Sequence, residues 1–307
     1  MPQISIIIPN YNHALYLKQR IDSVLNQTFL DFEVIILDDR SHDNSKEIIE
    51  QYRGHPKVSQ IVYNEVNSGS TFKQWQQGIQ RAKGNLIWLA ESDDFCKSTL
   101  LEDLYSLFEK NENLVLAYCR SNIVDSNGSI LNLGTWADAL DNKRWHSNYV
   151  NDGISEIKDF LLYRNIVLNA SSALFKKDVF LNIPTEAYMS FRYSGDWMVW
   201  AKILESGDIG YLHKPLNNFR THKLTTRNKS NIENERKRFR EYFRVIRYIE
   251  QKHSVIAKKE KHQWIIDEWI DKRDLAKINF LKYILPPIPT NYISMFYRNL
   301  LRKLLSK

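Results

Sequence analysis

The sequence has few cysteines and no long apolar run, and each absence removes a class of protein. Its two cysteines, Cys96 and Cys119, form no CxxC or Cys/His spacing, which excludes a disulfide framework and a structural zinc site. No apolar stretch approaches the roughly 20 residues that a membrane-spanning helix needs. Met1 leads directly into a strand-like run without a basic segment, so we expect no secretory signal. Free thiols indicate a reducing compartment, and we expect a cytoplasmic protein.

Acidic residues are scarce in the tail. The chain of 307 residues has a net charge of +7, and 43% of its residues are hydrophobic, enough for a substantial core. Residues 1–222 hold 22 Lys and Arg against 27 Asp and Glu, whereas residues 223–307 hold 21 against 9. The acidic first part therefore needs a cation before it can hold a phosphate. No nucleic-acid-binding motif accompanies the basic tail, so we expect no nucleic acid partner.

Strand and helix patterns alternate through the first 120 residues. Short strands are expected at residues 4–8, 32–37, 58–63, 85–90 and 114–118, with helices at 14–26, 45–52, 71–82 and 100–110. This alternation without hairpin signals predicts right-handed crossovers and a parallel sheet, which binds ligands at the carboxyl ends of its strands.

The pattern is less regular after residue 120. Residues 120–151, which include Trp136 and Trp145, predict loops and short strands. Further helices are expected at 155–163 and 196–205, and further strands at 170–175, 210–213 and 216–220. Long charged helices follow from residue 231.

Three carboxylates follow the strand at residues 85–90. Glu91, Asp93 and Asp94 stand within four residues, and groups so close repel one another unless a cation lies between them. Oxygen ligands of this kind suit Mg²⁺ or Mn²⁺ and leave positions for phosphate oxygens. The alternative is that Asp93 or Asp94 caps the next helix, which explains one of these acids but not all three.

Two neighbouring strand exits suit a nucleobase. Pro9 ends the first strand, and Tyr11 offers a ring that can lie against a flat base. Asp39 follows the second strand and can accept a hydrogen bond from a uracil N–H. A Pro-Asn turn and a pair of helix-capping acids would explain these residues equally well.

Three weaker signals complete the set of candidates. Lys73 lies in the first turn of a helix that follows a Gly-Ser-Thr segment suited to phosphate, although such segments are usually simple caps. Asp196 begins a helix and could act as a general base, although Asp is also a common N-cap. Arg220 could bind a diphosphate and His222 a metal or phosphate, although a lone histidine is more often structural.

The order of these motifs resembles that of inverting GT-A glycosyltransferases of family 2, over about residues 3–225. The resemblance implies an α/β fold of the GT-A type (Rossmann-like, as in nucleotide-diphospho-sugar transferases) with a C-terminal helical extension. It also implies a nucleotide-diphosphate-sugar donor, taken here as a UDP-sugar, and Mn²⁺ or Mg²⁺. The site residues that it implies are Pro9, Tyr11 and Asp39 for base and ribose, Lys73, Ser92, Asp94 and Arg220 for the rest of the donor, Asp93, Asp94 and His222 for the metal, and Asp196 as catalytic base.

Two positions depart from the family pattern. Glu91 replaces the usual first aspartate of the DxD-like cluster and is one methylene longer, which leaves its contact to ribose or metal open. Gly195 replaces the glutamate that commonly precedes the base, so Asp196 is the one acid in that motif.

The expected activity is transfer of a hexosyl or N-acetylhexosaminyl group, with inversion, to a hydroxyl of a glycan, glycolipid or glycoprotein in surface polysaccharide or glycoconjugate synthesis. Two other functions stay open. A nucleotidyltransferase that makes sugar nucleotides would want a Gly-rich, basic loop after the first strand, where this chain has Asn10-Tyr11-Asn12-His13. A non-catalytic sugar-nucleotide-binding scaffold would use the tail as its working part.

We expect a glycosyltransferase domain at residues 1–225 and a basic helical region at 226–307. Helices are expected at 231–252, at 257–285 and after the prolines at 286–289. The last helix places Phe296, Leu300 and Leu304 on one face, and its charges, including Lys307, are all positive. Such a helix either lies on an anionic membrane, at the inner face of the plasma membrane, or docks on the catalytic domain or a second subunit.

Overall fold

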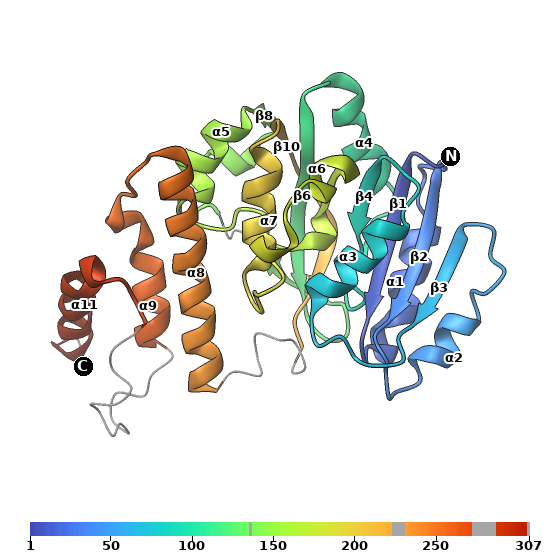
Figure 1. The fold of residues 1–307 in the computed structure, drawn as a ribbon, viewed down its shortest axis with the longest axis horizontal. Coiled ribbons are helices and arrows are strands. Elements are labelled where there is room, and N and C mark those ends of the chain that lie inside the picture. Colours follow the sequence, from blue (N-terminus) through green and yellow to red (C-terminus); the bar gives the residue numbers. More distant parts are fainter. Residues whose placement is uncertain (135–136, 223–230, 272–286, 306–307) are drawn as a thin grey trace.

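The computed structural model describes residues 1–134, 137–222, 231–271 and 287–305 (Figure 1). Trp136, Lys307 and the part of the expected helix beyond residue 271 lie outside these ranges. The described strands form one sheet in the order β3-β2-β1-β4-β9-β6-β10-β5, with β7 on β6 and β8 on β10. The strands are β1 Ile4–Asn10, β2 Phe32–Asp38, β3 Val58–Tyr63, β4 Leu86–Leu89, β5 Phe95–Cys96, β6 Leu114–Val124, β7 Ile130–Leu133, β8 Tyr149–Asn151, β9 Ala173–Lys176 and β10 Asp208–Arg220.

The first half of the sheet is parallel, as the alternating pattern predicts. Strands β2 and β4 flank β1 in parallel, and β3 pairs in parallel with β2. Beyond β4 the sheet is mixed, because β9 lies between β4 and β6 and runs antiparallel to both, whereas β6 and β10 are parallel to each other. A segment of four residues that follows a loop carries no periodicity that fixes its direction.

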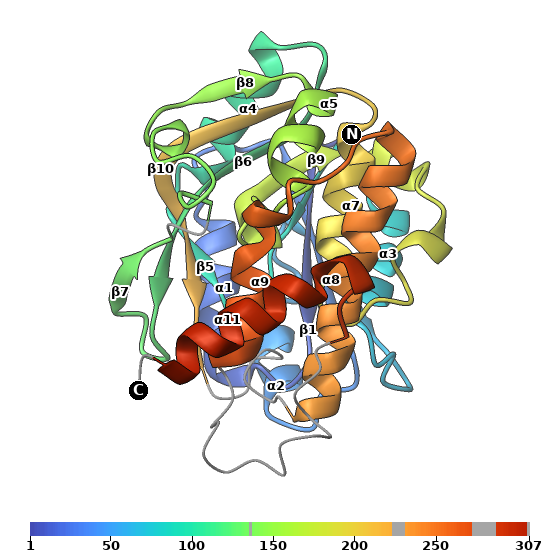
Figure 2. The same ribbon diagram turned by 90° about the vertical axis from the view of Figure 1, so that its left-hand side faces the viewer.

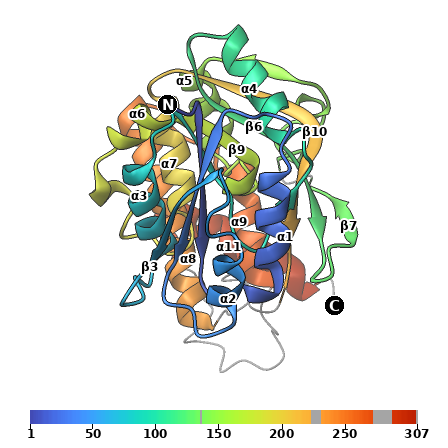
Figure 3. The same cartoon turned by 90° about the vertical axis from the view of Figure 1, so that its right-hand side faces the viewer.

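Successive residues of β1 point to opposite faces of the sheet, as the two-residue period of a strand requires. Ile6 and Ile8 belong to a hydrophobic cluster with α1 (Ala14–Leu25), α2 (Ser45–Glu50) and α4 (Leu100–Lys110). Ile7 points the other way, into a cluster with α3 (Thr71–Arg81) and α7 (Gly195–Leu204). Two helical layers therefore cover the sheet, as Figures 1 and 3 show.

The second half of the chain departs from the expected elements in three places. The two strands expected at 210–213 and 216–220 are one strand, β10, with a register shift between Leu212 and Pro215. The helix expected at 155–163 is a short α5 (Gly153–Glu156) followed by a wider π-helical turn at Ile157–Leu161. The short helix α6 (Lys177–Leu181) follows β9 directly.

In the described part of the chain, further α-helices follow β10, and the first of them packs against α7. They are α8 (Ile232–His253), α9 (Gln263–Asp271) and α11 (Ile293–Leu305). Phe239 and Phe243 of α8 lie in the same hydrophobic cluster as α7, and α11 lies across α9 (Figure 2). Nowhere in the described ranges is a helix both long and apolar enough to cross a bilayer.

Candidate active site

A cavity of about 400 Å³ opens at the carboxyl ends of β1, β2 and β4. Polar side chains dominate its lining, and residues from the loop before α7 and from the start of α8 close one side of it. It is lined by Pro9, Asn10, Tyr11, Asn12, His13, Asp39, Asn67, Gly69, Ser70, Thr71, Gln74, Glu91, Ser92, Arg192, Tyr193 and Asn234. The structure thus gathers Pro9, Tyr11, Asp39 and Ser92 of the predicted site around one space.

The base-binding candidates differ in how firmly they are held. Tyr11 is 44% exposed, so its ring is available to a ligand. Asp39 is buried, and its carboxylate accepts hydrogen bonds from the side chains of Asn64 (2.7 Å) and Gln74 (3.1 Å) and from the hydroxyl of Ser68 (2.7 Å). These donors fix the orientation of the carboxylate at the cavity wall.

Lys73 lies at the margin of this arrangement. Its side chain is exposed, and its ammonium group donates to the backbone oxygen of Ser68 at 3.3 Å. Gly69, with φ of +69°, makes the turn just before α3, and the lining of the cavity is formed by Gly69, Ser70 and Thr71 rather than by Lys73. A role of Lys73 toward phosphate stays a prediction.

The three carboxylates after β4 have different environments. Glu91 accepts a hydrogen bond from the indole N–H of Trp75 at 2.9 Å, and burial together with the charge of Asp93 raises the pKa of Glu91 to about 8. Burial also opposes the ionisation of Asp93, but the hydrogen bond with His222 and the charges of His13 and His222 hold the pKa of Asp93 below its ordinary value. Asp93 is therefore the most anionic member of the cluster.

The carboxylate oxygens of Asp94 are occupied by hydrogen bonds within the protein. It is 1% exposed, and its oxygens accept hydrogen bonds from the side-chain amide of Asn169 (2.5 Å) and from the backbone N–H of Arg220 (2.9 Å), with the guanidinium of Arg20 at 3.8 Å. This geometry favours a structural role over the predicted metal and donor contacts, because ligation would take the carboxylate from these donors.

Asp93 and His222 come together across the sheet, as the resemblance implies for a metal site. His222 Nε2 lies 3.1 Å from Asp93 Oδ2, and His13, which the sequence motifs leave without a role, joins them. One ligand atom from each of these three residues lies within 4.8 Å of the other two. This donor set fits a divalent cation.

The guanidinium of Arg220 connects several segments around Asp93 by hydrogen bonds. Its guanidinium donates to the backbone oxygens of Asp93 (2.7 Å) and Ser126 (2.9 Å) and to the side chain of Gln19 (2.6 Å). It is 1% exposed and is stacked over the ring of Tyr16. These contacts favour positioning of Asp93 over the predicted contact with a diphosphate.

Asp196 lies in the first turn of α7, and Asn165 donates to its carboxylate at 2.9 Å. The preceding turn is fixed by Glu241 of α8, a buried carboxylate that accepts three consecutive backbone N–H groups, those of residues 192–194, at 2.8, 2.7 and 3.0 Å. Sequence patterns missed Glu241 because it stands in a helix rich in charges that usually face water.

The packing around Gly195 explains why glycine stands at this position in place of the family's glutamate. A Cβ atom at this position would lie 2.6 Å from two ring carbons of Phe72, which is buried on α3. Helices α3 and α7 therefore approach each other at a point where a side chain has no room.

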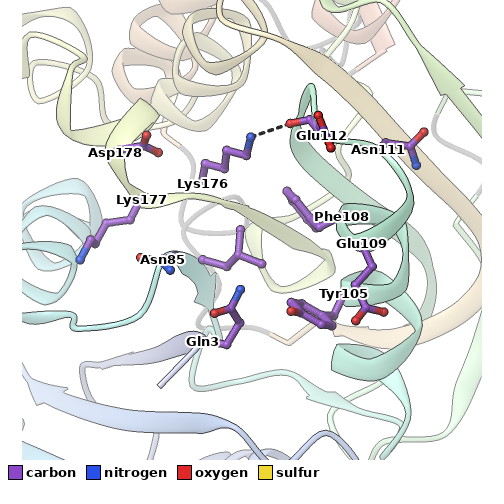
Figure 4. A pocket seen from close by; sticks show the side chains of 11 residues that line it. Gln3, Asn85, Tyr105, Phe108, Glu109, Asn111, Glu112, Lys176, Lys177 and Asp178 are labelled. Carbon is purple, nitrogen blue, oxygen red and sulfur yellow. Dashed lines mark hydrogen bonds between the residues drawn. The ribbon is translucent and has the colours of Figure 1, made fainter. Parts of the chain in front are cut away.

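A second cavity, of about 420 Å³, lies at the opposite end of the strands (Figure 4). Gln3 and Asn85 precede β1 and β4, and Lys176 reaches across to the backbone oxygen of Glu112 at 2.9 Å. None of the predicted site residues, all of which the structure describes, lines this cavity.

Known proteins with similar sequences are bacterial glycosyltransferases. The chain is 34% identical over 114 residues to glycosyltransferase GlyG of Streptococcus pneumoniae, covering 37% of this chain and 38% of that one. It is 34% identical over 117 residues to the poly(ribitol-phosphate) beta-N-acetylglucosaminyltransferase TarP of Staphylococcus aureus, covering 37% and 35%. The match thus spans less than two thirds of the length of these relatives.

Solved structures share the fold at low sequence identity. The complex of S. aureus TarS with UDP has a TM-score of 0.60 and 17% identity, covering 96% of this chain and 78% of that one. The mannosyltransferase PcManGT of Pyrobaculum calidifontis, solved with GDP-Man and Mn²⁺, has a TM-score of 0.57 and 12% identity, covering 99% and 85%. The likeness to TarS confirms the predicted GT-A fold.

The family model for glycosyl transferase family 2 matches residues 5–180, a segment that runs from β1 into α6. It contains both strand exits of the cavity and the carboxylate cluster after β4. Because the match covers more than half of the chain, the protein belongs to glycosyl transferase family 2.

Proposed function

We propose that the protein is a metal-dependent inverting glycosyltransferase that moves a sugar from a UDP-sugar to an acceptor hydroxyl. One observation carries the proposal. The donor set of His13, Asp93 and His222 adjoins the cavity that Tyr11 and Asp39 line, so a cation and a nucleotide would meet at the carboxyl ends of β1 and β4.

The donor is proposed from the cavity and from the neighbours. The ring of Tyr11 and the oriented carboxylate of Asp39 suit the face and the N–H edge of a uracil. TarS has been solved with UDP and with UDP-GlcNAc, which supports a uridine nucleotide and a hexosyl or N-acetylhexosaminyl group.

Asp93 and His222 would hold the Mn²⁺ or Mg²⁺ ion. When bound, such an ion stabilises the negative charge that develops on the leaving diphosphate. Two contacts would favour metal binding by Asp93. The hydrogen bond with His222 favours the ionised form of its carboxylate, and Arg220 fixes its backbone.

Asp196 would act as the base. Its carboxylate takes the proton of the acceptor hydroxyl while the oxygen attacks the anomeric carbon, and the bond from that carbon to the diphosphate breaks on the opposite face. This single displacement inverts the carbon and needs no enzyme nucleophile.

The test compares Asp196→Asn with Asp178→Asn, which changes an exposed acid in the first turn of α6 that lines the second cavity and not the candidate active site. Donor hydrolysis and thermal shift with UDP and Mn²⁺ are measured for both. We expect Asp196→Asn to lose turnover and keep metal-dependent stabilisation by UDP, and Asp178→Asn to keep both. A wild-type protein that binds UDP but turns over none of a panel of UDP-sugars in the presence of acceptors would instead be a scaffold.

We propose further that the acceptor is a growing glycan, glycolipid or glycoprotein presented at a membrane surface. Tyr297, Leu301 and Leu304 of α11 are exposed at helical spacing, with the exposed Arg298 and Arg302 beside them. An apolar stripe bordered by cations suits an anionic lipid surface. Co-sedimentation with vesicles that contain anionic lipid tests this, and binding that persists in Leu301→Glu would contradict it. A second copy of the chain on this face would appear as a dimer in solution.

A further inference from the structure

The backbone turn that precedes His13 is held by hydrogen bonds, although His13 lies outside the predicted site. It directly precedes α1, and the residue before it, Asn12, has φ of +56°, in the left-handed region that non-glycine residues seldom adopt. Two hydrogen bonds to the loop after β2 hold that turn: Asn12 N–H donates to Ser41 Oγ at 2.9 Å, and Asn12 Oδ1 accepts from the N–H of His42 at 2.7 Å. The strained turn thus sets the direction in which His13 leaves β1.

That direction brings His13 to Asp93 and His222. The ring centroids of the two histidines are 5.6 Å apart, with their planes at 85°, so the edge of one ring faces the other. Ligands bound at about 2.1 Å from one ion lie about 3 Å apart when adjacent and about 4.2 Å apart when opposite. The 3.1 Å between His222 Nε2 and Asp93 Oδ2 matches adjacent ligands, and the ligand atom of His13 lies within 4.8 Å of both, an upper bound slightly larger than the separation of opposite ligands.

Ser92 lies beside one nitrogen of the His13 ring. Its hydroxyl oxygen lies 2.8 Å from Nδ1 of His13 and is buried. When Ser92 accepts the proton of Nδ1, Nε2 keeps its lone pair and is the atom that can bind a cation. Metal-binding histidines are regularly fixed in this way by a partner on the second ring nitrogen.

The donor set has a chemical preference. Mg²⁺ takes oxygen ligands almost throughout, whereas imidazole suits first-row transition metals, whose affinity for nitrogen sites rises from Mn²⁺ onwards. We infer that His13 is a third protein ligand, so that the site, with two imidazoles and one carboxylate, takes Mn²⁺ or another first-row divalent cation in preference to Mg²⁺. The inference rests on the proposed metal-dependent function and adds to it a ligand and a metal class.

The test uses the full chain and Mn²⁺ itself as the probe. Electron paramagnetic resonance measures the affinity for Mn²⁺ with and without competing Mg²⁺, and pulsed measurements detect the coupling of ¹⁴N nuclei to bound Mn²⁺. We expect nitrogen couplings from two imidazoles in the wild type and from one in His13→Gln. The affinity of His13→Gln for Mn²⁺ should fall by about 10- to 100-fold, with a smaller preference over Mg²⁺.

The matched control is His42→Gln, which removes an exposed imidazole but leaves the backbone N–H that holds Asn12. It should bind Mn²⁺ as the wild type does. A second variant, His13→Glu, replaces the nitrogen donor by oxygen and should shift the preference toward Mg²⁺, which a folding defect would not do.

Two results would overturn the inference. Wild-type affinity and two nitrogen couplings in His13→Gln would show that His13 is not a ligand, while the proposed function stands. Absence of Mn²⁺ binding by the wild type, even with UDP present, would remove this inference together with the metal dependence of the proposed function.

Discussion

Glu241 is the residue whose replacement tests most directly how the catalytic turn is held. It lies on α8, yet its carboxylate accepts the backbone N–H groups of Arg192, Tyr193 and Ser194, immediately before Asp196. We expect Glu241→Ala to release this turn, because no other acceptor for these three groups is provided by the hydrogen bonds of the described residues.

The size of the effect follows from the three bonds. A hydrogen bond to a charged group contributes about 1.5–3 kcal/mol, and three that share one acceptor are not additive. We expect Glu241→Ala to lower the free energy of unfolding by about 3 kcal/mol. Glu241→Gln keeps one acceptor oxygen and should lose about half as much. A misplacement of Asp196 by about 1 Å would lower kcat by about 100-fold.

The assay measures kcat and KM for the donor beside urea unfolding. We expect kcat to fall in both variants and KM for the donor to rise as well, because Arg192 and Tyr193 of the released turn line the cavity. Glu233→Gln, at an exposed position of the same helix, is the control and should change neither kcat nor the free energy of unfolding. A wild-type kcat in Glu241→Ala, whatever its stability, would refute the positioning role.

Three further outcomes test other contacts. Burial lowers the pKa of His262 to about 4, against 6.5 in the unfolded chain, so its contribution to stability is complete above pH 6.5 and is lost as the pH falls toward 4. Between pH 7 and pH 5, the free energy of unfolding, measured in urea, should therefore fall by about 2 kcal/mol more in the wild type than in His262→Gln. An equal fall in both proteins would contradict this prediction. Gly195→Ala should cost about 1–3 kcal/mol through its contact with Phe72, and a Phe72→Leu background should relieve this cost in a double-mutant cycle. Arg220→Lys should lower the free energy of unfolding by about 2–4 kcal/mol, whereas a large loss of UDP affinity at unchanged stability would restore the predicted diphosphate contact.

The early part of the fold is predictable because its signals are local. Each buried strand before residue 90 is a short apolar run, and each helix has one apolar face, so the order of elements and the parallel half of the sheet follow. The direction of β9 is set by its partners β4 and β6, which no local pattern encodes.

The sequence predicts which kinds of side chain form the site, but it predicts less well which role each side chain has. Sequence patterns locate Asp39, Asp93 and His222 because each follows a strand. They cannot tell which charged groups the protein keeps for itself: Asp94 and Arg220 carry suitable chemistry but are held by protein partners. His13, 80 residues from Asp93, and Glu241 are found only when the chain has folded, because their roles depend on distant neighbours.

The place of β9 has a consequence for how the chain folds during synthesis. Strand β4 gains its outer partner only when residues 173–176 have been made, so until then the edge of Leu86–Leu89 remains unpaired. These four residues are all buried in the finished sheet, and an open apolar edge invites pairing with other chains. A nascent chain that stalls between residues 90 and 173 is therefore expected to aggregate or to require a chaperone, whereas one released after α6 can close its central sheet.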